Sequence, residues 1–277
     1  MQSMENRRSI FFISDSTAIT AHTLGKSPLT QFENVHFDQT ILPFVNTIER
    51  ARHAVVKINR AAKKNGVRPV LFCTLINQEI RNVIMTGEGV FFDFFGTFMS
   101  RMEEELSIES THIVGRYHGI FDDTYDVRIE AINYALHNDD GASTKDLDKA
   151  DIILVGVSRT GKTPTCLFLG MQFGIYAANY PITEENVIGR FYRLPAVLQL
   201  YHKKLFGLTI NPDRLQKIRS VRRPESGYSN VTQCEIEVSM AEAMFMREKI
   251  PFLNVTTISI EEIAATIIQR GKLQRRL

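Results

Sequence analysis

Cysteine is scarce in this chain, and its distribution excludes several kinds of protein. The three cysteines, Cys73, Cys166 and Cys234, stand far apart and form no CxxC pair. Such an odd, sparse set argues against a disulfide scaffold or a zinc cluster and is typical of reduced thiols in a cytoplasmic protein. Cys73 and Cys166 lie within apolar segments, so we expect buried rather than redox-active side chains there.

Long apolar runs and an excess of one charge are also lacking. No run of 18 apolar residues occurs, and the polar N-terminus MQSMENRRS contains no export-like apolar segment, so we expect neither a membrane-spanning helix nor export. The formal net charge of +2 gives no reason to expect nucleic acid as a partner. The basic residues between 270 and 276 are best interpreted as a solvated helix tail. We therefore expect a soluble cytoplasmic protein.

The composition that remains is ordinary for a folded protein, with 44% apolar and 23% charged residues. A chain of 277 residues can form one large or two medium domains. Short apolar segments typical of buried strands recur along it, at Ile10–Ile13, Val70–Leu75, Ile152–Val155, Ile175–Asn179, Phe206–Ile210 and Phe252–Val255. Helical patterns separate them, so the sequence predicts an α/β fold with mostly parallel sheets.

The helical patterns and one polar segment suggest how the chain is divided. Expected helices follow the turn after the first strand, begin at Asn46 or Thr47, and cover residues 77–106 and 125–136; the last begins at a capping box of Ser259 and Glu262. One residue of the polar turn 14–17 should cap the first helix. The polar segment 137–151 is the best domain boundary. We predict an N-terminal α/β domain over residues 1–146 and a P-loop kinase-like α/β domain over 147–277.

The clearest chemical signal is the run GVSRTGKT from Gly156 to Thr163, which matches the P-loop pattern GxxxxGK[ST] in full. It follows an apolar strand and precedes a helical pattern, which is the context that gives the pattern meaning. Glycines let successive N–H groups turn toward a phosphate, and the helix N-terminus favours the same anion. Lys162 adds a charge on the β-phosphate side, and the Thr163 hydroxyl suits a magnesium ion.

Other nucleotide-binding signatures are absent. No NKxD sequence occurs, which weighs against a GTPase. A Walker-B acid is not evident either, because the strand candidate FGLTI is followed by Asn211, with Asp213 two residues further on. Arg159, inside the motif, is either a phosphate contact or a solvent-facing side chain.

Candidates for proton transfer and metal binding come from the acidic turns. Asp139 and Asp140 precede Gly141 just before the P-loop strand. They are either solvated acids at a helix end, or they coordinate magnesium or act as a base for an attacking hydroxyl. Asp15 follows the first strand, where ligands of parallel sheets gather. His118 and His137 more often fill packing roles. Arg219, Arg222 and Arg223 are best interpreted as a solvated helix face, with docking of an acidic partner as the alternative.

Together these segments resemble the pyruvate, phosphate/water dikinase regulatory protein family, and most closely its phosphoenolpyruvate synthase branch. The match covers nearly the whole chain. Each matching segment is weak evidence alone, but their order along the chain is specific to the family. The segments are FFISDSTAITAHTLG, LPFV, GVRP, YDVRIEAINYALHNDDG, GVSRTGKTPT, MQFGIYAANYP and KLFGLTINPDRL. The family often has His-Asp-Asp before Gly141, whereas Asn138 stands here, which removes support for a histidine acid or base.

The resemblance implies a bifunctional serine/threonine-protein kinase and phosphorylase that acts on phosphoenolpyruvate synthase. ADP would donate a phosphoryl group to a target threonine and inactivate the target. Inorganic phosphate would remove that group as pyrophosphate. The predicted catalytic residues are Lys162, Asp139, Asp140 and Asp15, and Thr163 is the predicted ligand of Mg²⁺. The predicted phosphate cradle consists of Gly156, Val157, Ser158, Arg159, Thr160, Gly161, Lys162 and Thr163.

Three alternatives stay open at this point. The target could instead be pyruvate, phosphate dikinase, whose regulator would look similar at the P-loop. The chain could be a small-molecule P-loop kinase, although such an enzyme would not need the long N-terminal half. It could also be a nucleotide-sensing module that binds a partner without turnover. A homo-oligomer is compatible with all of them.

Overall fold

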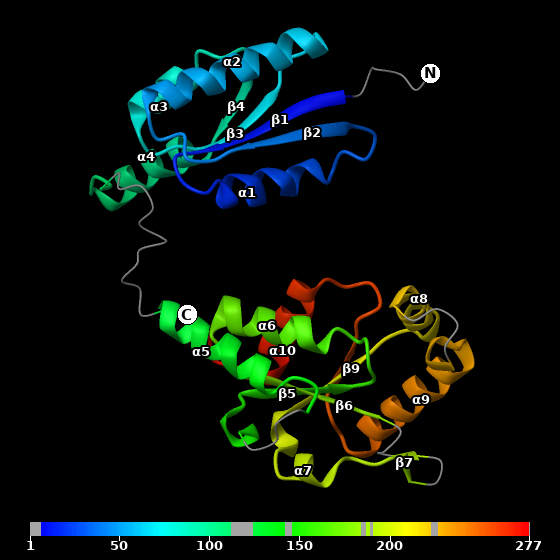
Figure 1. Ribbon diagram of the computed structural model, residues 1–277. Helices are drawn as coiled ribbons and strands as arrows, with labels where there is room; N and C mark the ends of the chain where they lie inside the picture. Colours follow the sequence, from blue (N-terminus) through cyan, green and yellow to red (C-terminus); the bar gives the residue numbers. More distant parts are fainter. Residues whose placement is uncertain are drawn as a thin grey trace, which may run out of the picture. The chain divides into compact units, whose positions relative to one another are not determined.

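The computed structural model describes residues 7–111, 124–141, 146–183, 187–188, 191–222 and 227–276. Contacts divide the chain into two compact units, Met1–Gly119 (unit 1) and Ile120–Leu277 (unit 2), both drawn in Figure 1. The division falls before helix α5 (Thr124–His137), which the sequence placed in the first domain. This helix lies on α6 (Lys162–Phe173) because Gly170 permits close contact; a Cβ there would lie 3.1 Å from the backbone of Ala131.

In unit 1 strands and helices alternate strictly along the chain, and the strands form one parallel sheet. Its four strands have the order β2-β1-β3-β4, and every pair is parallel. The elements are β1 (Arg7–Ser14), α1 (Ile19–Leu29), β2 (His36–Leu42), α2 (Ile48–Asn65), β3 (Val70–Thr74), α3 (Gln78–Ile84), β4 (Val90–Asp93) and α4 (Phe94–Leu106).

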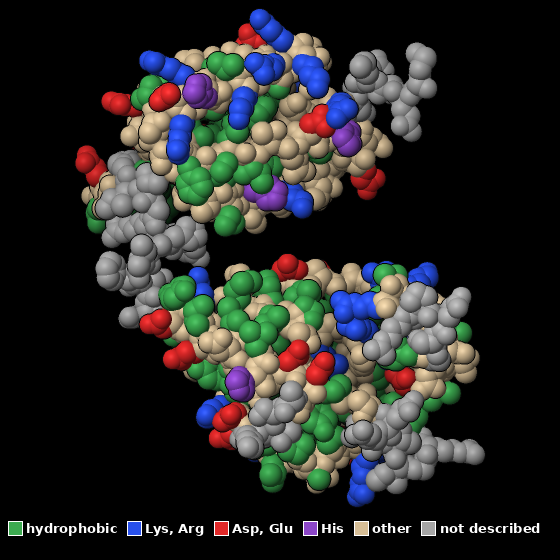
Figure 2. All heavy atoms as spheres, viewed as in Figure 1, with side chains coloured by type: hydrophobic (Ala, Val, Ile, Leu, Met, Phe, Trp, Pro, Cys, Tyr) green, Lys and Arg blue, Asp and Glu red, His purple; other side chains and the backbone are tan. Residues whose placement is uncertain are grey.

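Alternate residues of β1 and β3 supply two cores on opposite faces of this sheet. Phe11 and Ile13 of β1 pack with Ile58 of α2, and Phe12 packs on the other face against α1. Figure 1 shows α1 on the face opposite α2. Lys and Arg side chains are spread over the α2 side of unit 1 in Figure 2, so the outer face of this helix is solvated.

Two predictions for unit 1 are wrong in detail. Residues 77–106 are not one helix, because α3 ends at Ile84 and residues 90–93 form β4, an edge strand parallel to β3. A turn and bend over residues 85–89 interrupt the helical pattern there. The expected polar cap of α1 is also absent, since its N-cap is Ala18, with φ 64° and no side-chain hydrogen bond.

Unit 2 contains a second four-stranded parallel sheet, with the order β10-β9-β5-β6. Its strands are β5 (Ile152–Gly156), β6 (Ala177–Pro181), β9 (Leu205–Thr209) and β10 (Phe252–Asn254), and a separate antiparallel pair comprises β7 (Val187–Ile188) and β8 (Phe191–Tyr192). Its helices are α5, α6, α7 (Ala196–Gln199), α8 (Pro212–Arg222), α9 (Val231–Arg247) and α10 (Ile260–Gly271), with 3₁₀ turns at Leu147–Lys149, His202–Lys204 and Gly227–Ser229.

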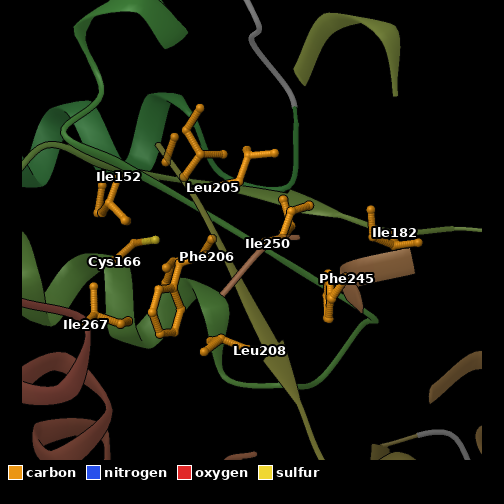
Figure 3. Packing of buried hydrophobic residues seen from close by; sticks show 14 of the residues in the cluster. Ile152, Cys166, Ile182, Leu205, Phe206, Leu208, Phe245, Ile250 and Ile267 are labelled. Carbon is orange, nitrogen blue, oxygen red and sulfur yellow. The ribbon is translucent and has the colours of Figure 1, made fainter. Parts of the chain in front are cut away.

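The core of unit 2 surrounds β5, which is buried over its whole length. Figure 3 shows Cys166 of α6 and Phe206 of β9 among the apolar side chains that pack there. All three cysteines are free and buried, as expected for Cys73 and Cys166, and burial raises the pKa of the Cys73 thiol to about 12. The predicted capping box of α10 is confirmed by both of its hydrogen bonds. None of the helices in the described ranges combines the length and hydropathy of a membrane span.

Candidate functional site

The site is built around the motif loop, Gly156–Thr163, which leaves the carboxyl end of β5 and continues into α6. Gly156 must be a glycine because a Cβ there would lie 2.3 Å from the carbonyl oxygen of Leu208 on β9. Gly161, the N-cap of α6, has φ 82°, which favours glycine. Arg159 adopts φ 77° without that advantage. The loop is therefore a tight, partly strained turn at a helix N-terminus.

Two carbonyl groups at the start of the motif loop accept hydrogen bonds, one from outside the loop and one from side chains within it. Gly156 O accepts from Ile182 N at 3.0 Å. Val157 O accepts from Thr160 Oγ1 at 3.0 Å and from Lys162 Nζ at 3.1 Å. A loop that binds an anion with its N–H groups must point its carbonyl groups elsewhere, and these bonds fix that orientation.

Lys162 is the charged centre of the site. Its side chain is buried, and burial lowers the pKa of its ammonium group to about 8, although the nearby carboxylates of Asp140 and Asp139 oppose this shift. A buried ammonium group beside two carboxylates is costly to desolvate and is typical of a functional position.

Asp139 is placed directly against the hydroxyl group of Thr163. Thr163 Oγ1 donates to Asp139 Oδ1 at 2.7 Å, and Asn179 Nδ2 donates to the same oxygen and also to Thr163 Oγ1 at 3.3 Å. The sequence lacks an evident Walker-B acid at a strand end. In the structure a carboxylate from the turn after α5 lies next to the hydroxyl group of Thr163 instead.

Asn179, in β6, holds the whole acidic turn in place. Its side-chain Oδ1 accepts from Asp140 N at 3.0 Å, and its carbonyl oxygen accepts from Gly141 N at 3.2 Å. Asp140 and Gly141 both have positive φ, at 51° and 70°, so the turn depends on these bonds. No sequence motif marks Asn179 as a site residue; the structure places it opposite Leu154 of β5 in the register of the two strands.

A cavity of about 520 Å³ opens over the motif loop. Its lining contains two carboxylates, Asp139 and Asp140, and three cations, Arg159, Lys162 and Arg222. The Asp140 carboxylate makes no hydrogen bond to another described residue. The cavity therefore offers a buried cation, a helix N-terminus and an uncommitted carboxylate to an anionic ligand.

The structure thus brings together the motif loop, Lys162, Thr163, Asp139 and Asp140 within unit 2. Asp15 belongs to unit 1, where it is buried and its Oδ2 accepts from Ile76 N at 2.7 Å. Burial raises the pKa of this carboxyl group, while hydrogen bonds from backbone N–H groups oppose the shift.

The remaining candidates are two histidines and three arginines, and their environments differ. His137 is exposed at the end of α5, and His118 and Arg223 lie outside the described residues. Arg222 is exposed and lines the cavity. The prediction of a solvated helix face is wrong for Arg219, which is fully buried and paired with Glu237.

Comparison with known proteins gives a consistent family for nearly the whole chain. A family model described as Kinase/pyrophosphorylase matches residues 10–268. A protein of Alkalilimnicola ehrlichii is 52% identical over 274 residues, which is 99% of each chain. One of Halorhodospira halophila is 53% identical over 276 residues, with 99% of this chain and 100% of the relative covered.

A third relative, from Pseudomonas savastanoi pv. phaseolicola, is 52% identical over 271 residues, covering 98% of this chain and 99% of its own. The curated names of all three relatives refer to a phosphoenolpyruvate synthase regulatory protein. The resemblance noted from the sequence is confirmed.

Proposed function

Because the chain belongs to the kinase/pyrophosphorylase family, we propose that it is a bifunctional phosphotransferase that regulates phosphoenolpyruvate synthase. In one direction it transfers the β-phosphoryl group of ADP to a threonine of that enzyme and inactivates it. In the other it transfers the same group from phosphothreonine to inorganic phosphate, releasing pyrophosphate and restoring activity.

The observation that carries this proposal is the pair of carboxylates at the mouth of the motif loop. Asp139 is bound to Thr163, whereas the Asp140 carboxylate stays free for proton transfer on the same cavity wall. Phosphoryl transfer needs positioned positive charge and one group that accepts a proton. Lys162, the N–H groups of the motif loop and Asp140 supply these two requirements within one cavity.

In the kinase direction the threonine Oγ attacks the β-phosphorus of ADP. The bond from that phosphorus to the oxygen bridging it to the α-phosphorus breaks, and AMP leaves with the electron pair. Asp140 accepts the threonine proton. Lys162 and the N–H groups of the motif loop stabilise the charge that builds up on the transferred group.

In the phosphorylase direction an oxygen of inorganic phosphate attacks the phosphorus of phosphothreonine. The bond between that phosphorus and the threonine oxygen breaks, Asp140 returns a proton to this oxygen, and pyrophosphate leaves. Negative charge develops at the same place in both reactions, so one preorganised site serves both.

The residues present also fit a magnesium ion. Thr163 Oγ1 and Asp139 Oδ1 lie 2.7 Å apart, and hydroxyl and carboxylate oxygens are the hard donors that Mg²⁺ prefers. Mg²⁺ would neutralise phosphate charge when bound. In this assignment Asp139 and Thr163 hold the ion, and Asp140 is left as the base.

The test is a transfer assay with purified phosphoenolpyruvate synthase, purified pyruvate, phosphate dikinase and ADP labelled at the β-phosphate. We expect label on a threonine of phosphoenolpyruvate synthase, loss of its activity, and AMP as the second product. Inorganic phosphate added afterwards should release the label as pyrophosphate. The Lys162→Ala variant serves as the control and should lose both reactions.

Other results would each contradict a defined part of the proposal. Label only on pyruvate, phosphate dikinase would change the target but keep the chemistry. Turnover of small acceptors alone would indicate a metabolite kinase. Nucleotide binding without any transfer would leave a non-enzymatic binding module.

A further inference from the structure

One carbonyl group of the motif loop has its partner far away in the sequence. Ser158 O accepts a hydrogen bond from Arg219 Nη2 of α8 at 3.2 Å. The N–H groups of this loop can face an anion only if the adjacent carbonyl groups face away from it. The bond from Arg219 therefore satisfies the carbonyl group that this geometry turns into the protein.

Arg219 is an unusual residue to find in that position, because its side chain is completely buried. Its Nη2 also donates to Glu237 Oε2 of α9 at 2.7 Å, and its Nε is buried without a hydrogen-bond partner in the described part of the chain. A buried ion pair with one unsatisfied donor stabilises a fold little or not at all. Its cost suggests a role other than stability.

Tyr228 connects the same guanidinium group to Ser158 a second time. The guanidinium carbon of Arg219 lies 4.1 Å from the centre of the Tyr228 ring, and Arg219 Nη1 donates to Tyr228 O at 3.2 Å. The Tyr228 hydroxyl group donates to Ser158 Oγ at 2.9 Å. Ser158 is thus held through both its carbonyl oxygen and its side chain, by residues 61 and 70 positions away.

We propose that Arg219, Tyr228 and Glu237 form a clamp that sets the phosphate-binding conformation of the motif loop from its outer side. This inference rests on the proposed function, since it assigns the clamp to the loop that would hold the β-phosphate. The clamp residues are positioning residues, because they touch Ser158 rather than the reacting atoms. Arg159, the next residue, has positive φ, so the loop has a strained conformation that fixed neighbours must maintain.

The clamp also explains why side chains of α8 line the cavity. Ile218 and Arg222 line the cavity on either side of Arg219 in the sequence. Anchoring Arg219 to Ser158 therefore fixes the helix that carries Arg222 against the loop. Lysine cannot replace Arg219 here, because a single ammonium group has neither the planar stacking surface nor the fork of donors that this arrangement uses.

The first test removes only the hydrogen bond between Tyr228 and Ser158. Tyr228→Phe and Ser158→Ala should each raise the Kd for ADP about three- to tenfold, the usual effect of losing one hydrogen bond. The Kd of the double variant for ADP should equal that of the single variant with the higher Kd, because both changes remove the same bond. Calorimetric titration below the unfolding temperature of each variant gives these values.

The second test compares two arginines that each pair with a carboxylate and lie over a tyrosine ring, one fully buried and the other part-exposed. Arg276 pairs with Asp151 at 2.8 Å and lies 4.3 Å from the centre of the Tyr176 ring, but it does not touch the motif loop. Arg219→Lys should raise the Kd for ADP more than tenfold, whereas Arg276→Lys should lower the unfolding temperature and leave the Kd unchanged. If Arg219 had a purely structural role, Arg219→Lys would lower the unfolding temperature and leave the Kd for ADP unchanged.

The outcomes separate the clamp from the proposed function. Wild-type affinity for ADP in Tyr228→Phe, Ser158→Ala and folded Arg219→Lys would overturn the clamp and leave the proposed function intact. A wild-type protein that binds no ADP would overturn the proposed function and the clamp with it. Additive losses in the double variant would also contradict the clamp.

Discussion

The two sheets of this protein invite a direct comparison. Each has four parallel strands, and in each a polar turn follows a central strand at its carboxyl end, β1 in unit 1 and β5 in unit 2. Ligands of parallel α/β sheets bind at such edges. The rule therefore predicts a site in both units, yet the polar groups at the two strand ends have different partners.

At the edge of unit 1 the polar groups are bound to the protein itself. Ser14 Oγ donates to Thr74 O at 3.3 Å and accepts from Ser16 N at 3.1 Å. The Asp15 carboxylate is buried against the backbone N–H of Ile76. These side chains pair with backbone groups at the carboxyl ends of β1 and β3, where the ladder of the sheet stops, and so they stabilise the fold locally.

At the edge of unit 2 the carboxylates come from outside the sheet. Asp139 and Asp140 lie on the turn after α5, and they line a cavity together with Lys162. A strand end alone does not identify a site. In unit 2 a buried cation and two carboxylates face one cavity beside the motif loop.

The largest expected effect is on proton transfer. Asp140→Asn removes the proposed base and should lower kcat of the kinase reaction by about 10²- to 10⁴-fold. The Kd for ADP should stay the same or fall, because a negative charge beside the phosphates is lost. The matched variant Asp139→Asn should instead raise the Mg²⁺ concentration that gives half-maximal activity. Single-turnover assays over a series of Mg²⁺ concentrations measure both; equal, mild effects would contradict the division of roles.

A smaller effect is expected at Asn179, which touches no reacting atom. Asn179→Ala removes the side-chain bonds to Asp139, Asp140 and Thr163, so kcat should fall about tenfold or more while the sheet persists. Asn179→Asp should be worse than Asn179→Ala, because it places a further carboxylate beside Asp139. Kinase rates and circular dichroism spectra of both variants check this; a milder effect of the aspartate variant would count against the assigned contacts.

The third prediction concerns pH. Burial lowers the pKa of Lys162 to about 8, and a phosphate favours the protonated form. Below this pH the ammonium group is already present, so the Kd for ADP should be nearly constant. Above about pH 8 binding must be accompanied by proton uptake, and the Kd should rise by up to about tenfold per pH unit. Lys162→Arg, which stays charged, should remove this dependence; an unchanged pH profile in that variant would assign the titration to another group.

The smallest effect is expected in unit 1. Asp15→Asn retains an acceptor for Ile76 N and removes a charge. The pKa of Asp15 is raised in the folded protein, so its contribution to stability is lost as pH rises through that pKa, and its ionised form destabilises the fold at neutral pH. The variant should therefore be as stable as the wild type or slightly more so in urea unfolding at pH 7. If it instead abolished phosphoryl transfer while remaining folded, the catalytic role predicted for Asp15 would stand.

Much of the fold could be predicted because its signals are local. The strands β1, β3, β5, β9 and β10 are short apolar segments, and the capping box of α10 is read from neighbouring residues. β4 was missed because Val90–Asp93 reads as part of a helical region when its pairing with β3 is unknown.

The residues of the candidate site also differ in whether local sequence reveals them. The motif loop and the acidic pair are contiguous, so the sequence alone identifies them. Asn179 and Arg219 act on the site through contacts 16 to 61 residues distant, and Arg219 was interpreted as solvated because it lies on a basic helix. Only the parallel pairing of β6 with β5 and the packing of α8 on α9 place these two side chains at the loop.

We propose that the motif loop of unit 2, and not the turn after β1 in unit 1, holds the phosphates of the nucleotide. Calorimetric titration of ADP into the full chain and its Lys162→Ala and Asp15→Asn variants tests it most directly. We expect Lys162→Ala to lose about a hundredfold or more in affinity for ADP and Asp15→Asn to keep the wild-type affinity. Wild-type affinity in Lys162→Ala, or a comparable loss in Asp15→Asn, would contradict it.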